Sequence, residues 1–114
     1  MSDFRQTILV GRVGKDPVAK QVGTTNLTEF PLAVNDEYDK KKAHWYQCKA
    51  WKKLGEIAVK YLKKGNSVMV VGRISLEEYT AKDGANKAYL RLDVDKIVFM
   101  PQQHLEVPEE EDKF

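Results

Sequence analysis

The chain has 114 residues, of which 42% are apolar and 32% are charged, a composition typical of one water-soluble globular domain. It holds no run of about 20 apolar residues, so we expect no membrane span, and its start lacks the basic and apolar segments of a secretion signal. The single cysteine, Cys48, cannot form an internal disulfide, which favours a cytoplasmic location.

Charge is unevenly distributed along the chain. Residues 1–104 hold 18 Lys and Arg against 12 Asp and Glu, a net charge of +6, whereas residues 105–114 hold one lysine and five acids, a net charge of −4. We therefore expect a folded domain over residues 1–104 and a short, acidic, disordered tail over residues 105–114. A basic body favours an anionic partner. Surface lysines whose role is only to keep the protein soluble would give the same net charge.

Apolar residues recur with a period of two in most of the chain, which predicts strands. The expected strands are, in order, residues 8–10, 30–34, 44–51, 68–80 and 88–100. After the first strand, Gly11 and Gly14 mark positions where a barrel strand can bend. In the second strand, Pro31 lacks a backbone N–H and needs an edge or bulge position.

One segment has the period of a helix instead. Its apolar positions are Leu54, Ile57, Ala58, Tyr61 and Leu62. They predict an amphipathic helix of about three turns, with Gly65 as the residue just past its C-terminal end and no convincing N-cap. Polar residues 35–43 and 81–87 form loops, and the second contains the turn signal Asp83-Gly84.

The predicted order is three strands, a helix and two strands. This order indicates an all-β fold with one helix, namely a five-stranded OB-fold β-barrel whose helix lies between strands 3 and 4. Barrels of this kind commonly bind oligonucleotides or oligosaccharides.

The third strand, residues 44–51, carries the strongest functional pattern. Alternation places Trp45, Gln47, Lys49 and Trp51 on one face, and Tyr46, Cys48 and Ala50 on the other, which is small and mostly apolar and suits the barrel interior. Two exposed indoles beside a lysine suit single-stranded nucleic acid, because bases stack on aromatic rings and phosphates pair with lysine. The alternative is that both indoles fill the core or a subunit interface.

Two further aromatic residues lie beside cations. Tyr38 adjoins the lysine run 40–42, and Tyr79 is in phase with Arg73 on the long fourth strand. These pairs extend the expected stacking surface and its phosphate contacts. The lysine run by itself would equally suit a solvated loop.

Other kinds of site are not indicated. His44 and His104 are far apart and have no cysteine at a metal-ligand spacing, and no phosphate-binding or nucleophile motif occurs. Asp93 and Asp95 suit a solvated strand face, and Cys48 suits the core. We expect no enzyme activity, no cofactor and no metal.

The sequence resembles the bacterial single-stranded DNA-binding protein family over about residues 4–100. The matching pieces are residues 8–17 (ILVGRVGKDP), Trp45 and Trp51 six positions apart, residues 53–58 (KLGEIA), residues 61–65 (YLKKG) and residues 71–74 (VGRI). The resemblance implies an OB fold that assembles as a homotetramer and binds single-stranded DNA without sequence preference, in replication, recombination and repair at the nucleoid.

The resemblance also implies roles for individual residues. The base-stacking positions of the family fall on Tyr38, Trp45, Trp51 and Tyr79. Its phosphate contacts fall on Lys53, Lys64 and Lys87, with Arg73 nearby and with Lys40 and Lys49 added from the residues themselves.

The family's acidic tip, which recruits repair and replication proteins, falls on Glu109, Glu110, Glu111, Asp112 and Phe114. This chain departs from the family in its very short linker and in Lys113, where a proline is usual. Glu77 and Glu78 stand where basic residues are common, and Tyr46 replaces a frequent histidine at a subunit contact. The short tail is compatible with a chromosomal, accessory, plasmid or phage form.

A rival hypothesis comes from a different functional class. An OB-fold module of the primosome type, which works mainly through protein contacts, predicts a dimer with weak DNA binding. The retained aromatic set argues against it. A small nuclease is the remote third reading, because nothing in the sequence supplies a catalytic group.

Overall fold

The computed structural model describes residues 3–101. Within this range the chain forms six strands and one helix: β1 (Thr7–Val13), β2 (Val18–Val22), β3 (Thr25–Asn35), β4 (Ala43–Trp51), α1 (Lys52–Tyr61), β5 (Ser67–Thr80) and β6 (Asn86–Phe99). The predicted all-β fold with one helix is confirmed. The helix follows the third predicted strand, β4, and precedes the fourth, β5.

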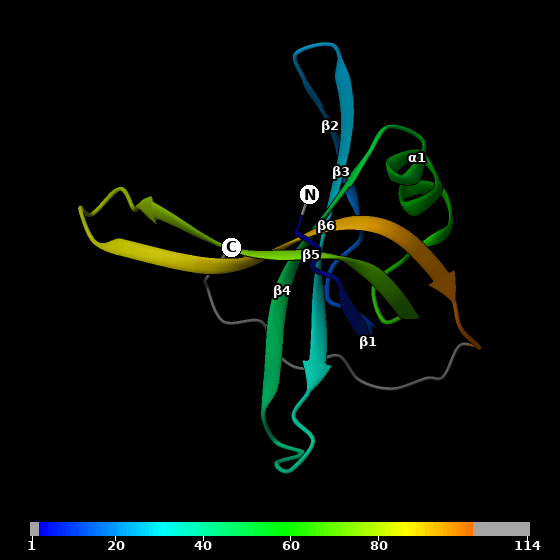
Figure 1. Cartoon of the computed structure of the whole chain (residues 1–114), viewed down its shortest axis with the longest axis horizontal. Helices are drawn as coiled ribbons and strands as arrows, with labels where there is room; N and C mark the ends of the chain where they lie inside the picture. The colour runs from blue at the N-terminus through cyan, green and yellow to red at the C-terminus, as the bar shows by residue number, and fades with distance from the viewer. Residues whose placement is uncertain (1–2, 102–114) are drawn as a thin grey trace.

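The strands close into a barrel. Neighbours follow the order β1-β5-β6-β4-β3, and β1 also pairs with β3, which closes the circle. All of these pairings are antiparallel except that of β4 with β6, which is parallel. Figure 1 shows the β5–β6 hairpin reaching out to one side of the barrel, the β2–β3 hairpin to another and the β3–β4 loop to a third. This is the five-stranded Greek-key barrel that the sequence predicted.

The strand β2 was not predicted, and β3 begins earlier than expected. β2 pairs with the first half of β3 through a turn at Gly23, whose φ is 62°. Every residue of β2 is exposed. A strand that buries neither face has no apolar alternation, so the period-two pattern could not reveal it.

Two residues lie near the place where β1 pairs with β3, and the structure explains why each residue type occurs there. A Cβ at Gly11 would lie 2.3 Å from the carbonyl oxygen of Ala33, so the close approach of β1 to β3 requires glycine. Pro31 lies between the last pair of β3 with β2, at Glu29, and the first with β1, at Leu32. Its carbonyl accepts the N–H of Gly14 at 2.8 Å. The missing N–H of proline therefore falls where β3 changes partners, which meets the predicted need for an irregular position.

The core fills the barrel and the space under α1. Its buried side chains come from all five barrel strands and from α1: Val13, Phe30, Leu32, Cys48, Ala50, Ala58, Leu62, Val68, Val70, Leu92 and Val94. The prediction that Cys48 is a core residue is confirmed, and burial raises the pKa of its thiol. Thr28, the buried polar residue of β3, donates its hydroxyl to the carbonyl of Gly55 in α1 at 2.8 Å.

The predicted helix is confirmed, but its end differs. No side chain caps its start: Trp51 precedes it without a capping hydrogen bond. The helix ends at Tyr61, and the extended Leu62 donates its N–H to the carbonyl of Ala58 at 2.9 Å. Gly65 therefore lies beyond the cap, and its predicted role as the next residue is wrong. Leu62 is nonetheless buried as the helical period predicts, since its side chain is 2% exposed in the core although its backbone is extended.

Candidate nucleic-acid interface

The outer face of β4 has the composition that the sequence predicted. Cys48 and Ala50 point into the barrel and are fully buried, whereas Trp45, Lys49 and Trp51 remain partly exposed. Neighbouring strands extend this face. We define the aromatic face as Trp45, Gln47, Lys49 and Trp51 of β4, Glu29 of β3, and Tyr89, Arg91 and Asp93 of β6.

Trp45 lies directly over a glycine of the β1–β2 connection. A Cβ added to Gly14 would lie 2.4 Å from Cζ3 and 2.9 Å from Cη2 of the indole, and 3.4 Å from Pro31. The ring therefore rests on the backbone of Gly14. The Gly14 backbone supports the ring from below, which is favourable for stacking because less rotamer freedom remains to be lost.

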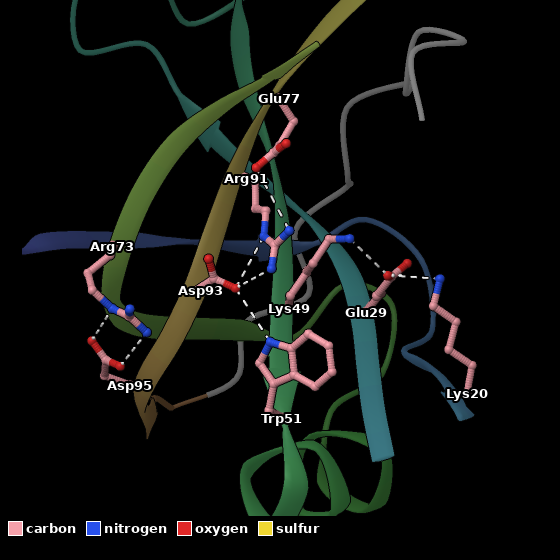
Figure 2. Close-up of polar contacts among 9 residues, drawn as sticks. All are labelled: Lys20, Glu29, Lys49, Trp51, Arg73, Glu77, Arg91, Asp93 and Asp95. Carbon is pink, nitrogen blue, oxygen red and sulfur yellow. Dashed lines mark hydrogen bonds and ion pairs between the residues drawn. The ribbon is translucent and has the colours of Figure 1, made fainter. Parts of the chain in front are cut away.

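Trp51 is held by an acidic residue from a different strand. Its indole N–H points at Oδ1 of Asp93 at 3.5 Å, and the same oxygen accepts Nε and Nη2 of Arg91 at 3.2 and 2.9 Å. Arg91 also approaches Glu77 of β5 at 3.8 Å. The hydrogen bonds from Asp93 raise the pKa of the Arg91 guanidinium further above its ordinary value. Figure 2 shows the indole and the guanidinium meeting at this carboxylate.

Lys49 is also paired. Its ammonium lies 3.2 Å from Oε1 of Glu29, which Lys20 of β2 approaches at 3.0 Å (Figure 2). Burial by itself would raise the pKa of Glu29, but the two lysines outweigh that effect and hold this pKa below its ordinary value. The Lys49 side chain is only 15% exposed. A phosphate reaching Lys49 would therefore have to compete with Glu29.

Arg73 lies at the edge of the aromatic face. It is opposite Asp93 in the β5–β6 register and forms hydrogen bonds with Asp95 at 3.1 and 3.3 Å. The sheet is irregular at this point, because Asp95 is skipped between the pairs of Val71 and Gly72. Both side chains are about half exposed, at 49% and 52%, so this pair is well screened by water.

Tyr79 lies on the β5–β6 hairpin opposite Lys87. Its ring packs edge-on against Tyr89, with the centroids 6.0 Å apart. A hollow of about 530 Å³ is lined by Tyr79, Lys87 and their hairpin neighbours. A second hollow, of about 280 Å³, is lined by both Trp45 and Tyr89. The second hollow lies between the start of β4 and the β5–β6 hairpin, because residues of both line it. We define the aromatic strip as Trp51, Trp45, Tyr89 and Tyr79.

Tyr38 and Lys40 lie apart from this strip, in the β3–β4 loop. Tyr38 is 95% exposed. The loop is organised by Asp36, whose carboxylate accepts His44 Nε2 at 2.8 Å and the backbone N–H groups of Tyr38 and Asp39 at 3.0 and 2.9 Å. These bonds, that from His44 foremost, lower the pKa of Asp36 to about 2.

The remaining predicted phosphate contacts lie on the side of α1. Lys53 is exposed in the first turn of α1, and Lys64 is exposed in the connection to β5, where its backbone N–H binds Asp16 at 2.8 Å. Figure 1 shows α1 on the opposite side of the barrel from the tip of the β5–β6 hairpin. The structure thus places Trp45, Lys49, Trp51, Arg73, Tyr79 and Lys87 on three neighbouring strands, β4, β6 and β5. It places Tyr38 and Lys40 on the β3–β4 loop and Lys53 and Lys64 on the side of α1.

Tyr89 and Arg91 were not among the predicted site residues. Both are partly exposed and share the face of β6 that carries Asp93, a face that the alternation of Arg91 and Asp93 with Leu90, Leu92 and Val94 indicates in the sequence. No sequence signal indicates their neighbours, because their place beside β4 depends on a parallel pairing that places Arg91 opposite Gln47.

Over residues 3–101, no group of three or more His, Cys, Asp and Glu is arranged to hold a metal ion. In the same range no helix is long and apolar enough to cross a membrane. His104 and the predicted acidic tip, Glu109 to Asp112 with Phe114, lie outside the described residues.

Known proteins resemble this chain in both sequence and fold. A mitochondrial single-stranded DNA-binding protein of Bos taurus is 32% identical over 114 residues, covering 88% of this chain and 77% of the relative. A single-stranded DNA-binding protein of Xanthomonas axonopodis pv. citri is 37% identical over 92 residues, covering 74% of this chain and 51% of the relative. The fold resembles the crystal structure of a small single-stranded DNA-binding protein from Streptomyces coelicolor, with a TM-score of 0.74, 22% identity and coverage of 84% of this chain and 94% of that one. The model of the single-strand binding protein family matches residues 4–100, and the chain therefore belongs to that family.

Proposed function

We propose that this protein binds single-stranded DNA without sequence preference. The observation that carries the proposal is the aromatic face: Trp45 and Trp51 are partly exposed on one strand, with Lys49 between them and Arg91 alongside, in a member of the single-strand binding protein family. Bases stack on such rings whatever their identity, because every base has a π-face.

The strip from Trp51 to Tyr79 supplies the path for the strand. Trp51, Trp45 and Tyr79 are the stacking positions, and Tyr38 extends the path onto the β3–β4 loop. Phosphates between the stacked bases are taken by the cations along the strip, which are Lys49, Arg73, Lys87 and Arg91. Farther along the strand, Lys40 on the β3–β4 loop and Lys53 and Lys64 on the side of α1 take further phosphates. We assign the protein no catalytic step.

The assembly that we propose is a homotetramer, with a dimer as the alternative. Ile8 and Val10 on the outer face of β1 are 59% and 50% exposed, and neighbouring Met69 and Val98 extend this apolar surface across β5 and β6. An apolar sheet face of this kind favours contact with another chain.

We further propose a two-part organisation, with the OB-fold domain over residues 1–104 and a short acidic tail over residues 105–114. Glu109, Glu110, Glu111, Asp112 and Phe114 of the tail would engage replication and repair proteins or compete with DNA for the basic body. This role places the protein in DNA replication, recombination and repair, in the cytoplasm at the nucleoid. The net charges of +6 and −4 on the two parts support the division.

Tryptophan fluorescence tests the proposal directly. Oligo-dT should quench the emission, and a duplex of equal length should bind far more weakly, because its bases are already stacked on one another. Trp45→Ala and Trp51→Ala should each weaken binding by about 1–3 kcal/mol, whereas Lys40→Ala should weaken it less and mainly flatten the dependence on salt. Equal binding of duplex and single strand would refute the proposal.

One observation favours a second candidate, a primosome-type module that acts mainly through protein contacts. The four cations Lys20, Lys49, Arg73 and Arg91 are paired with four carboxylates, so this surface carries no net charge to attract DNA from a distance. The second candidate predicts a dimer and weak binding. The mass of the assembly, measured beside the titration, separates the two candidates.

A further inference from the structure

The two carboxylates beside Arg91 differ in how they are held. The Asp93 side chain is 21% exposed and lies 2.9 Å from Arg91, whereas the Glu77 side chain is 40% exposed and lies 3.8 Å from the same arginine. The hydrogen-bonded, less exposed pair is the stronger, because water screens it less and its geometry is better. Asp93 is therefore a fixed partner of Arg91, and Glu77 an exchangeable one.

A single oxygen of Asp93 joins two strands. Its Oδ1 accepts the indole N–H of Trp51 from β4 and two N–H groups of Arg91 from β6 (Figure 2). Nη1 of Arg91 faces the other way, toward Glu77. The indole and the guanidinium thus share one acceptor oxygen, and the Nη1 edge of the guanidinium remains for another anion.

We propose that Asp93 is a positioning residue of the single-stranded DNA interface. It holds Trp51 to receive a base and Arg91 to receive the adjacent phosphate, and the phosphate takes the place of Glu77 on Arg91 while Asp93 keeps its own contacts. This inference rests on the proposed function. It adds Arg91 to the DNA contacts and gives the two carboxylates opposite effects.

The opposite effects expected for Asp93 and Glu77 on DNA affinity make the inference testable. Removing a negative charge from a surface that binds a polyanion strengthens binding, whichever carboxylate is removed. That rule predicts tighter binding for both Asp93→Ala and Glu77→Ala. A positioning role predicts weaker binding for Asp93→Ala, because Trp51 and Arg91 lose their common anchor and must be ordered when DNA binds.

The experiment titrates oligo-dT into the full chain and its variants, with mass and thermal midpoint recorded for each. We expect Asp93→Ala to bind about three- to tenfold more weakly and Glu77→Ala about twofold more tightly. Arg91→Gln should bind more weakly and lower the salt slope by about one. Tighter binding by Asp93→Ala, similar to that of Glu77→Ala, would overturn the proposal.

Two further variants separate positioning from a general structural role. In the Trp51→Ala, Arg91→Gln double variant, Asp93→Ala should cause no further loss of affinity; a loss that persists there would overturn the proposal. Should Asp93→Ala fail to fold, Asp93→Leu keeps a side chain of similar size without an acceptor oxygen, and its weaker or tighter binding decides in the same way.

The proposed function fails separately from this inference. If oligo-dT neither binds the wild-type protein nor quenches its tryptophans, single-stranded DNA binding itself is refuted. If the wild type binds and Trp51→Ala weakens binding, but Asp93→Ala tightens it, only the positioning role of Asp93 is refuted.

Discussion

The packing of Trp45 against Gly14 leads to a prediction that separates DNA binding from stability. In Gly14→Ala, the new Cβ would lie 2.4 Å from the indole, whereas ordinary contact begins at 3.4 Å, so the ring must move by about 1 Å. The ring is partly exposed, so it can move outward. We therefore expect the free energy of unfolding to change by less than about 1 kcal/mol, a range typical of glycine-to-alanine changes without backbone strain.

DNA binding should respond more strongly. A stacked base contributes about 1–3 kcal/mol, and a displaced ring should lose part of this, which corresponds to an affinity about three- to tenfold lower. The assay is fluorescence titration with oligo-dT in a Trp51→Phe background, so that Trp45 alone reports. Gly23→Ala is the matched control: nothing lies within 4 Å of its new Cβ, but its φ of 62° strains alanine, so it should lose stability and keep its DNA affinity. Unchanged affinity and emission for Gly14→Ala would refute the reasoning.

Three other outcomes are expected. Gly55→Ala should destabilise the fold by about 2 kcal/mol in chemical denaturation, despite alanine's higher helix propensity, because its Cβ would lie 2.6 Å from the carbonyl oxygen of Ala50. The pKa of Asp36, lowered to about 2 by His44 and two backbone N–H groups from an ordinary 3.8, contributes stability that is present above pH 3.8 and lost as the pH falls toward 2. The thermal midpoint of Asp36→Asn should accordingly fall less than that of the wild type between pH 5 and pH 2. Deleting residues 105–114, which carry a net charge of −4, should leave the assembly mass unchanged and raise DNA affinity modestly at low salt, and unchanged affinity would favour the partner-binding role of the tail.

Local pattern was sufficient for most of the fold. Alternation located the five barrel strands, and it divided β4 correctly into a buried face with Cys48 and an outer face with Trp45 and Trp51. The helical period located α1. The same reasoning missed β2, because a strand exposed on both faces has no apolar period. It also misplaced the helix end, because the apolar period continues through Leu62, which is buried just past the last helical residue.

The candidate site depended more on tertiary structure. The sequence identified the tryptophans and the nearby cations as residue types suited to single-stranded DNA, and the motifs pointed to the family. It could not show that Lys49 is paired with Glu29, or that Trp51 and Asp93, 42 positions apart, share a hydrogen bond.

The physical reason is the distance along the chain over which each determinant of structure acts. Which face a side chain occupies follows from the period of its own strand, so a few consecutive residues determine it. Which side chain lies opposite depends on the register between strands that are distant in the sequence, here the antiparallel β3–β4 pair and the parallel β4–β6 pair. The sequence alone therefore determined that this chain presents aromatic rings and cations on one face of a small barrel. Only the folded barrel decided which carboxylates hold those cations, and that Trp45 rests on the backbone of Gly14.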